Sequence, residues 1–205
     1  MATRRKYLRF GLVGLLIFVA VAVAVLIGRR AGSGKDGSDS FAAVTASPVP
    51  AGAVATPSDA LPERIIIPRI GVDAPVSVKT IGSDGIMQSP NGPEDVAWYD
   101  FSARPGSGGN AVFSGHVDYH DYGAAVFAKV KDLRNGDLIE VQALNGQTFR
   151  YQVVASVTYQ ENEAPVEDIV GETSREVITL ITCAGSFDSS TRQYSERLVV
   201  RAERI

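Results

Sequence analysis

Short stretches of alternating hydrophobic and polar residues follow one another through the last two thirds of the chain. Alternation with a period of two is typical of β-strands that bury one face. It predicts strands at 64–78, 110–116, 137–144, 148–160, 176–183 and 196–205. Pro68 and Gly71 divide the first segment into two strands, and Asn145-Gly146 predicts a hairpin. Seven or eight short strands favour a β-barrel or a β-sandwich.

Helical patterning is scarce in this part of the chain. We expect one helix over residues 123–133 and a helical turn over residues 164–171. Trp98 and Tyr99 lie outside the predicted strands, and we expect them to pack on the outside of the domain or along its N-terminal flank. The fold class that follows is mainly β.

The N-terminal 30 residues differ in character from the rest. An apolar run over residues 11–27 follows four basic residues and ends at Gly28-Arg29-Arg30. Seventeen helical residues extend for about 26 Å, close to the thickness of a bilayer core. The length of the run and its basic exit favour an uncleaved transmembrane signal anchor, and the alternative is a cleaved signal peptide.

The residues that flank the apolar run predict how the chain is arranged. The basic residues before it favour a cytoplasmic N-terminus over residues 1–10, which leaves the remainder outside the cytoplasm. Residues 28–61 are rich in Gly, Ala, Ser and Pro and show no periodicity, which predicts a flexible linker. A folded extracellular domain over residues 62–205 follows.

The distribution of charge excludes one class of partner. The whole chain has a formal net charge of −3, whereas residues 36–205 carry 13 basic and 23 acidic side chains, a net charge of −10. A domain with this charge is a poor candidate for nucleic-acid binding, which rewards clustered Lys and Arg. We therefore expect no nucleic-acid partner.

Cys183 is the only cysteine in the chain. Outside the cytoplasm cysteines usually pair as disulfides, so a single one suggests intermolecular pairing or a reactive thiol. A buried cysteine that acts as a small hydrophobic residue is the alternative. The strand pattern breaks at Ala184-Gly185, so we expect Cys183 to lie where its strand ends.

Two histidines and two arginines are candidate partners of this thiol. His116 directly follows a predicted strand, so it can meet Cys183 at one rim of a barrel, while His120 lies in a predicted loop. A thiolate beside an imidazole is a simple nucleophile pair for opening an acyl bond. Acyl transfer also needs a donor for the oxyanion, and Arg192 and Arg197 are the candidates.

These residues resemble the sortase family. The run TLITC at 179–183 matches the TLxTC signature of sortases, and SGH at 114–116 matches their histidine site. Arg197, followed by Leu-Val-Val, is similar to the arginine at the start of the last strand in sortases. The resemblance extends over residues 62–205 and implies an eight-stranded sortase β-barrel with short helices.

The class F branch of sortases is the most similar. The segments WY at 98–99, PGSGGNAVFSGHVD and TCAGSFD carry this likeness. The chain departs from the class F pattern in one respect, since that pattern has an arginine slightly earlier in the last segment, near Ser195 here. Arg197 is the functional arginine that we expect, and Arg192 is the alternative.

The resemblance implies a mechanism. Cys183 attacks the threonine carbonyl of an LPxTG-like sorting signal on a surface protein, and His116 acts as general acid and base, paired with the thiolate as imidazolium. Arg197 binds the substrate and stabilises the oxyanion. The thioacyl intermediate then passes to an amine of peptidoglycan or of its lipid-linked precursor. No cofactor or metal is implied, and the setting is the membrane of a Gram-positive type of cell envelope.

Other interpretations remain open from the sequence. His116, Asp118, His120 and Cys183 could together bind zinc. Acidic residues in the segment 161–168 could bind calcium. A hydrolase or carboxypeptidase on the same fold would differ only in passing the acyl group to water, and a non-enzymatic surface binding module is the remaining alternative.

Overall fold

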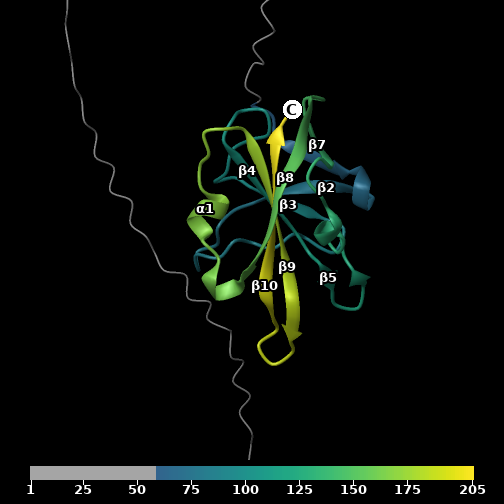
Figure 1. Ribbon diagram of the computed structural model, residues 1–205, viewed down its shortest axis with the longest axis vertical. Coiled ribbons are helices and arrows are strands. Elements are labelled where there is room, and N and C mark those ends of the chain that lie inside the picture. Colours follow the sequence, from purple (N-terminus) through teal and green to yellow (C-terminus); the bar gives the residue numbers. More distant parts are fainter. Residues whose placement is uncertain (1–58) are drawn as a thin grey trace, which may run out of the picture. The chain divides into compact units, whose positions relative to one another are not determined.

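The computed structural model describes residues 59–205, which form a closed barrel of eight β-strands (Figure 1). The order around the barrel is β1-β2-β3-β4-β9-β10-β8-β7. The barrel strands are β1 Pro62–Ile67, β2 Val72–Lys79, β3 Val96–Tyr99, β4 Asn110–Gly115, β7 Leu138–Ala143, β8 Thr148–Gln160, β9 Val177–Asp188 and β10 Gln193–Arg204. The prediction of a mainly β domain with an eight-stranded barrel is confirmed.

Two pairs of barrel strands run parallel and the others run antiparallel. The parallel pairs are β2 with β3 and β4 with β9. The predicted Asn145-Gly146 hairpin is confirmed, since β7 and β8 pair in antiparallel register on either side of it. Strand β10 lies between β9 and β8, and the β9–β10 hairpin extends downward in Figure 1 beyond the rest of the barrel.

The interior of the barrel is filled by side chains from every strand. Alternate residues of β9 and β10 point inward, as Ile178 and Leu180 do on β9 and Leu198 and Val200 do on β10. All four belong to the main hydrophobic core. The residues between them therefore point away from this core.

The predicted helix over residues 123–133 is wrong. This segment contains the two-residue strand β6 Gly123–Ala124, which pairs with β5 Asp118–Tyr119, and only the 3₁₀ turn η2 Val130–Asp132. The backbone N–H groups of residues 125, 126 and 127 bond to carbonyls of residues 117, 93 and 116. Because these N–H groups already donate to carbonyls of other segments, they cannot donate to the residue four positions earlier, as an α-helix requires.

The other helical elements are short. They are η1 Pro68–Ile70, η3 Glu161–Glu163 and α1 Val166–Val170. The predicted helical turn over residues 164–171 corresponds to α1, which lies at the left of Figure 1.

Strand β3 was missing from the sequence prediction. Its four residues are all buried, so the segment shows no alternation by which a half-exposed strand is recognised. Trp98 belongs to the main core, which contradicts the expectation that it packs on the outside. Tyr99 faces the other way, into a second cluster with Ala97 and Val112.

Strand β9 continues beyond the point where the sequence pattern breaks. Cys183 lies inside β9, which ends only at Asp188, so the expectation of a strand end at Cys183 is wrong. Gly185 has φ of 76°, in the left-handed region that favours glycine, and the β9–β10 register shifts nearby, between Tyr194 and Glu196. The irregular backbone hides the strand from pattern analysis without ending it.

The predicted anchor over residues 11–27 and nearly all of the predicted linker over residues 28–61 lie outside the described residues. Within residues 59–205, no helix is long and apolar enough to cross a membrane. The anchor therefore stays a prediction.

Candidate active site

Three neighbouring strands bring His116, Cys183 and Arg197 together. Strands β4 and β9 are paired as far as Ser114 and Ile181, and His116 and Cys183 each follow two residues later. On the other side of β9, Arg197 of β10 is the direct partner of Cys183. Directly opposed residues have Cβ atoms about 5 Å apart and side chains on the same face. The sequence prediction that these residues converge agrees with this arrangement.

The shared face lies on the outside of the barrel. Leu180 and Leu198 point into the core, so Cys183 and Arg197, each an odd number of positions away, point outward. Both side chains are half-buried. The thiol is therefore sheltered by its neighbours without being enclosed in the core.

The two threonines of the TLITC run fix β9 against β4. Thr179 is buried and its hydroxyl donates to the side-chain oxygen of Asn110 at 2.7 Å. Thr182 is also buried and donates to the carbonyl oxygen of Gly115 at 2.8 Å. Gly115 precedes His116 and Thr182 precedes Cys183, so this bond sets the spacing of the two candidate residues.

Contacts of the backbone and of the ring fix the position of His116. Its carbonyl oxygen accepts a bond from the N–H of Phe127 at 2.9 Å. Its ring contacts Tyr119 edge-on, with ring centroids 5.2 Å apart. A side chain at residue 115 would place its Cβ 2.6 Å from the Phe127 ring, so glycine is required next to His116. These contacts fix the backbone from which the imidazole projects.

Arg197 is bound by an acidic partner as well as by backbone oxygens. One terminal nitrogen of its guanidinium donates to the carboxylate of Glu161, the first residue of η3, and both side chains are 26% exposed. The other donates to the carbonyl oxygens of Glu196 at 2.9 Å and Tyr194 at 3.3 Å. A guanidinium has five N–H groups, so some remain for a ligand.

The surroundings of Cys183 keep its thiol protonated at rest. Burial raises the pKa of the Cys183 thiol, Arg197 lowers this pKa, and the carboxylates of Glu161 and Asp118 raise it. The net pKa lies above the ordinary value for cysteine. Near neutral pH the thiol therefore needs a base before it can act as a nucleophile.

A second contact links the segment after His116 to the β9–β10 hairpin. The hydroxyl of Tyr194 donates to the carboxylate of Asp118, and the Tyr194 ring packs against Phe187 with centroids 5.1 Å apart. Burial, helped by Asp118, raises the pKa of Tyr194 to about 12. Tyr194 therefore stays neutral and holds the two segments together beside Cys183 over the working pH range.

The remaining sequence candidates lie elsewhere or alone. Arg192 is exposed in the turn of the β9–β10 hairpin, whereas Arg197 faces Cys183. His120 is exposed and lies 3.1 Å from Asp121. Within residues 59–205, no group of three or more His, Cys, Asp or Glu side chains is close enough to hold a metal ion. The zinc set of His116, Asp118, His120 and Cys183 is therefore not assembled there.

Sequence analysis missed the roles of Glu161 and Tyr194. Glu161 appeared only as one acid of the segment 161–168, which was considered for calcium. Its partner Arg197 lies 36 positions away, and Asp118 lies 76 positions from Tyr194. One signal is local: Asp118 lies two residues after His116. In an extended chain this spacing places both side chains on the same side, which could have indicated Asp118 as a neighbour of the site.

A comparison with protein-family models identifies the family of this domain. The sortase domain model matches residues 65–205, which is more than half of the chain. The chain belongs to the sortase family. The sortase resemblance seen in the sequence is thus confirmed at the level of the family.

Solved sortase structures are similar to this sortase domain. Sortase C-1 from Actinomyces oris is 29% identical, with 69% of this chain and 72% of that chain covered and a TM-score of 0.54. A lid mutant of sortase A from Corynebacterium diphtheriae is 25% identical, with 69% and 68% covered and a TM-score of 0.54. Sortase C1 from Streptococcus agalactiae is 26% identical, with 69% and 66% covered and a TM-score of 0.53. A search of curated protein sequences found no match.

Proposed function

We propose that this sortase is a cysteine transpeptidase that cleaves an LPxTG-like sorting signal and joins the cleaved protein to an amine. The pairing of Cys183 with Arg197 across β9 and β10, with His116 at the end of the adjacent β4, carries the proposal. In this arrangement a nucleophile, a base and an oxyanion donor lie on one outer face. Membership of the sortase family supports the same chemistry.

The first half of the reaction forms a thioester. The sulfur of Cys183 attacks the carbonyl carbon of the substrate threonine while His116 takes the thiol proton. Because burial raises the pKa of the Cys183 thiol, a base beside the sulfur assists the attack. The carbon–nitrogen bond then breaks, and His116 returns the proton to the leaving amine.

The second half transfers the acyl group. An incoming amine attacks the thioester carbon, the carbon–sulfur bond breaks, and the proton lost by the amine passes through His116 to the thiolate. In both halves the free N–H groups of Arg197 donate to the carbonyl oxygen as it becomes negative. Glu161 and the two backbone carbonyls hold the guanidinium in place for this purpose.

The cellular setting belongs to the same proposal. A single membrane anchor over residues 11–27 and a linker over residues 28–61 would hold the catalytic domain outside the cell, close to a Gram-positive type of wall. The donors would be surface proteins that carry the sorting signal. The acceptor would be an amine of peptidoglycan or its lipid-linked precursor. Within the family, we propose the class F branch on the basis of the segments quoted above.

A peptide assay with the full chain in detergent micelles tests the reaction. A fluorogenic LPxTG peptide is incubated with the chain, with and without a glycine or diamine nucleophile, and products are identified by mass. We expect cleavage and a product joined to the amine, and neither with Cys183→Ala.

Two results would contradict the proposal. Cleavage that gives only the free acid would favour a hydrolase. Absence of cleavage, together with a Cys183 thiol that a small alkylating reagent does not modify, would favour a binding module with a buried cysteine.

A further inference from the structure

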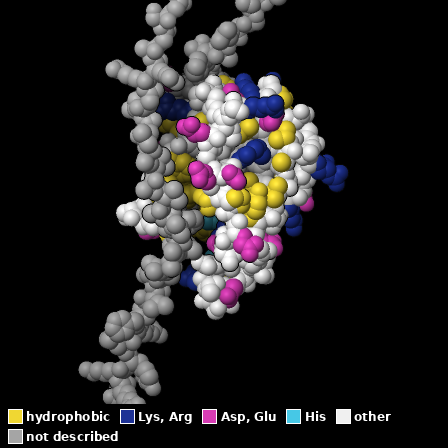
Figure 2. All heavy atoms as spheres, turned by 60° about the vertical axis from the view of Figure 1, so that its left-hand side comes forward, with side chains coloured by type: hydrophobic (Ala, Val, Ile, Leu, Met, Phe, Trp, Pro, Cys, Tyr) yellow, Lys and Arg dark blue, Asp and Glu magenta, His cyan; other side chains and the backbone are white. Residues whose placement is uncertain are grey.

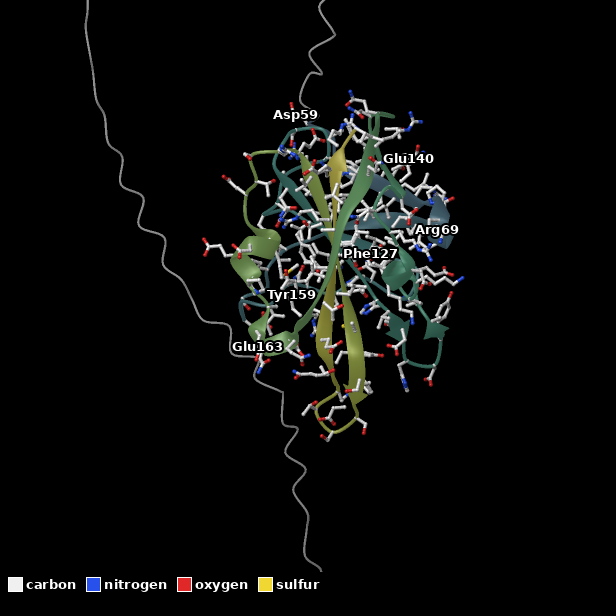
Figure 3. All side chains as sticks on the ribbon, in the orientation of Figure 1. Asp59, Arg69, Phe127, Glu140, Tyr159 and Glu163 are labelled. Atoms are coloured by element: carbon white, nitrogen blue, oxygen red, sulfur yellow. The ribbon has the colours of Figure 1, made fainter. Side chains whose placement is uncertain are left out.

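A basic cleft lies on the surface of the barrel. It has a volume of about 650 Å³ and is formed by the η1 turn and the segment around η2. Its lining residues are Arg69, Ile70, Gly71, Lys129, Lys131, Asp132, Leu133 and Arg134. In Figure 3, Arg69 lies at the right-hand edge, while Tyr159 and Glu163 lie at the lower left. None of the proposed catalytic residues lines the cleft.

The charge of the cleft is opposite to that of the surrounding domain. Four of the 13 basic side chains in residues 36–205 line it, against one acidic side chain, Asp132. Residues 36–205 as a whole carry 23 acidic side chains. On the face that Figure 2 brings forward, by comparison, acidic and basic side chains are intermixed. A concave surface lined by one sign of charge concentrates its electric field.

The cations of the cleft are largely unneutralised. Within residues 59–205, the side chains of Lys129, Lys131 and Arg134 make no hydrogen bond or ion pair. Arg69 has one acidic partner, Asp137, whose oxygen lies 3.9 Å away. Gathering these charges without partners is unfavourable by itself, and a bound anion would relieve their repulsion.

The backbone beneath these side chains is fixed by the core. Ile70, Val130 and Leu133 are all buried and belong to the main hydrophobic core. Gly71 closes the η1 turn with φ of 70° and donates its N–H to the carbonyl of Pro68. The backbone that carries the four basic side chains is therefore fixed around a preformed cleft. This lowers the entropy cost of binding a ligand there.

We propose that this cleft binds an anion that carries two or more phosphate groups. Guanidinium forks and ammonium groups are the side chains that bind phosphate oxygens most strongly. The cleft lies within the usual range of ligand pockets, about 300–1,000 Å³, so it exceeds what one phosphate fills. The inference is independent of the proposed acyl transfer. Free polyphosphate and the headgroup of a phospholipid with two phosphates, such as cardiolipin, share this chemistry.

Two titrations of the full chain in neutral maltoside micelles test the proposal and separate its two sources. In the first, sodium tripolyphosphate is added and the heat of binding is measured at low and at physiological salt. In the second, cardiolipin, whose headgroup has two phosphates, is added to the micelles and protection of the lysines from acylation is followed by mass spectrometry. Binding of tripolyphosphate alone identifies a free anion, and protection by cardiolipin identifies a headgroup.

A charge-neutralised variant and a matched control locate the binding. The variant is Lys129→Gln/Lys131→Gln/Arg134→Gln, and the control, Lys79→Gln/Arg175→Gln/Arg192→Gln, removes the same number of basic residues elsewhere on the surface. Circular dichroism verifies that both fold. We expect the variant to lose affinity by about tenfold or more and the control to keep it within about twofold. Equal binding by the variant, equal weakening by the control, or no binding by the original chain would overturn the proposal.

Discussion

At the scale of single residues, Glu161 acts on two groups of the candidate site at once. Its carboxylate binds the guanidinium of Arg197, and its charge opposes ionisation of Cys183. Under the proposed mechanism, the first effect would fix the oxyanion donor and the second would favour a protonated thiol before substrate binds. The two effects can be separated by mutation.

We expect Glu161→Gln to make the Cys183 thiol ionise at lower pH. The carboxylate raises the pKa of the thiol, so removing its charge lowers this pKa and increases the thiolate fraction near neutral pH. The rate of alkylation by iodoacetamide, measured from pH 6 to pH 10 by mass spectrometry, should rise several-fold at pH 7.

Glu163→Gln is the matched control for this measurement. Glu163 is an exposed residue of the same η3 turn, labelled in Figure 3, and is not among the charges that shift the pKa of the thiol. Its substitution should leave the alkylation profile unchanged. A Glu161→Gln profile that coincides with the original, or that moves to higher pH, would show that Glu161 does not act on the thiol.

The two candidate arginines predict different losses of activity. Arg197 faces Cys183 and offers donors to an oxyanion, so Arg197→Ala should lower kcat/KM for peptide cleavage by about 10²–10³-fold. Arg192 lies exposed in a turn, so Arg192→Ala should remain within about twofold of the original. Steady-state cleavage of the fluorogenic peptide measures both. A larger loss from Arg192→Ala would reverse the assignment.

At the scale of elements, the parallel contact between β4 and β9 determines the distance between His116 and Cys183. Asn110, at the start of β4, is 3% exposed and holds one end of this contact. Its amide donates to the carbonyls of Ile169 and Gly171, each at 3.0 Å, and its oxygen accepts from Thr179. One side chain thus joins β4, β9 and the end of α1.

We expect Asn110→Ala to destabilise the domain by about 2–4 kcal/mol, because it leaves several buried polar groups without a partner. Urea unfolding followed by fluorescence measures the change. Asn135→Ala, at an exposed position next to a turn, serves as control and should change the free energy of unfolding by less than about 0.5 kcal/mol. A change below 1 kcal/mol for Asn110→Ala would contradict the view that this network fixes β4 on β9.

At the scale of the whole molecule, closure of the barrel leaves no exposed edge among its eight strands. Strand β1 closes the ring, since it pairs with β2 on one side and with β7 on the other. The last residues of the chain are also tied in, because Arg204 donates to the carbonyl of Arg150 and lies over the ring of Phe149. The ring is therefore expected to fold as one cooperative unit.

A fragment of residues 59–205 should unfold in a single transition. The midpoints measured by far-UV and near-UV circular dichroism during heating should coincide, since secondary structure and packing are lost together. A fragment of residues 68–205 lacks β1 and exposes the edges of β2 and β7, so it should not show this transition. Separate midpoints for the longer fragment, or a native-like transition of the shorter one, would refute closure as the source of cooperativity.

The sequence by itself determined the local features of this protein. Alternation of hydrophobic residues and the turn at Asn145-Gly146 depend only on residues that are close in the sequence. They therefore predicted most barrel strands. The TLITC run, the strand before His116 and the position of Arg197 are also local, and they indicated the sortase family. The residues expected to converge do lie on neighbouring strands.

Only the tertiary structure decided the features that depend on distant partners. Strand β3 is buried on both faces, and residues 125–127 give their N–H groups to other segments, so neither can be read from local periodicity. The ion pair of Glu161 with Arg197 forms because β8 pairs with β10 up to Gln160, the residue before Glu161. The basic cleft joins residues some 60 positions apart. Such contacts are fixed by strand register and barrel closure, which no single segment contains.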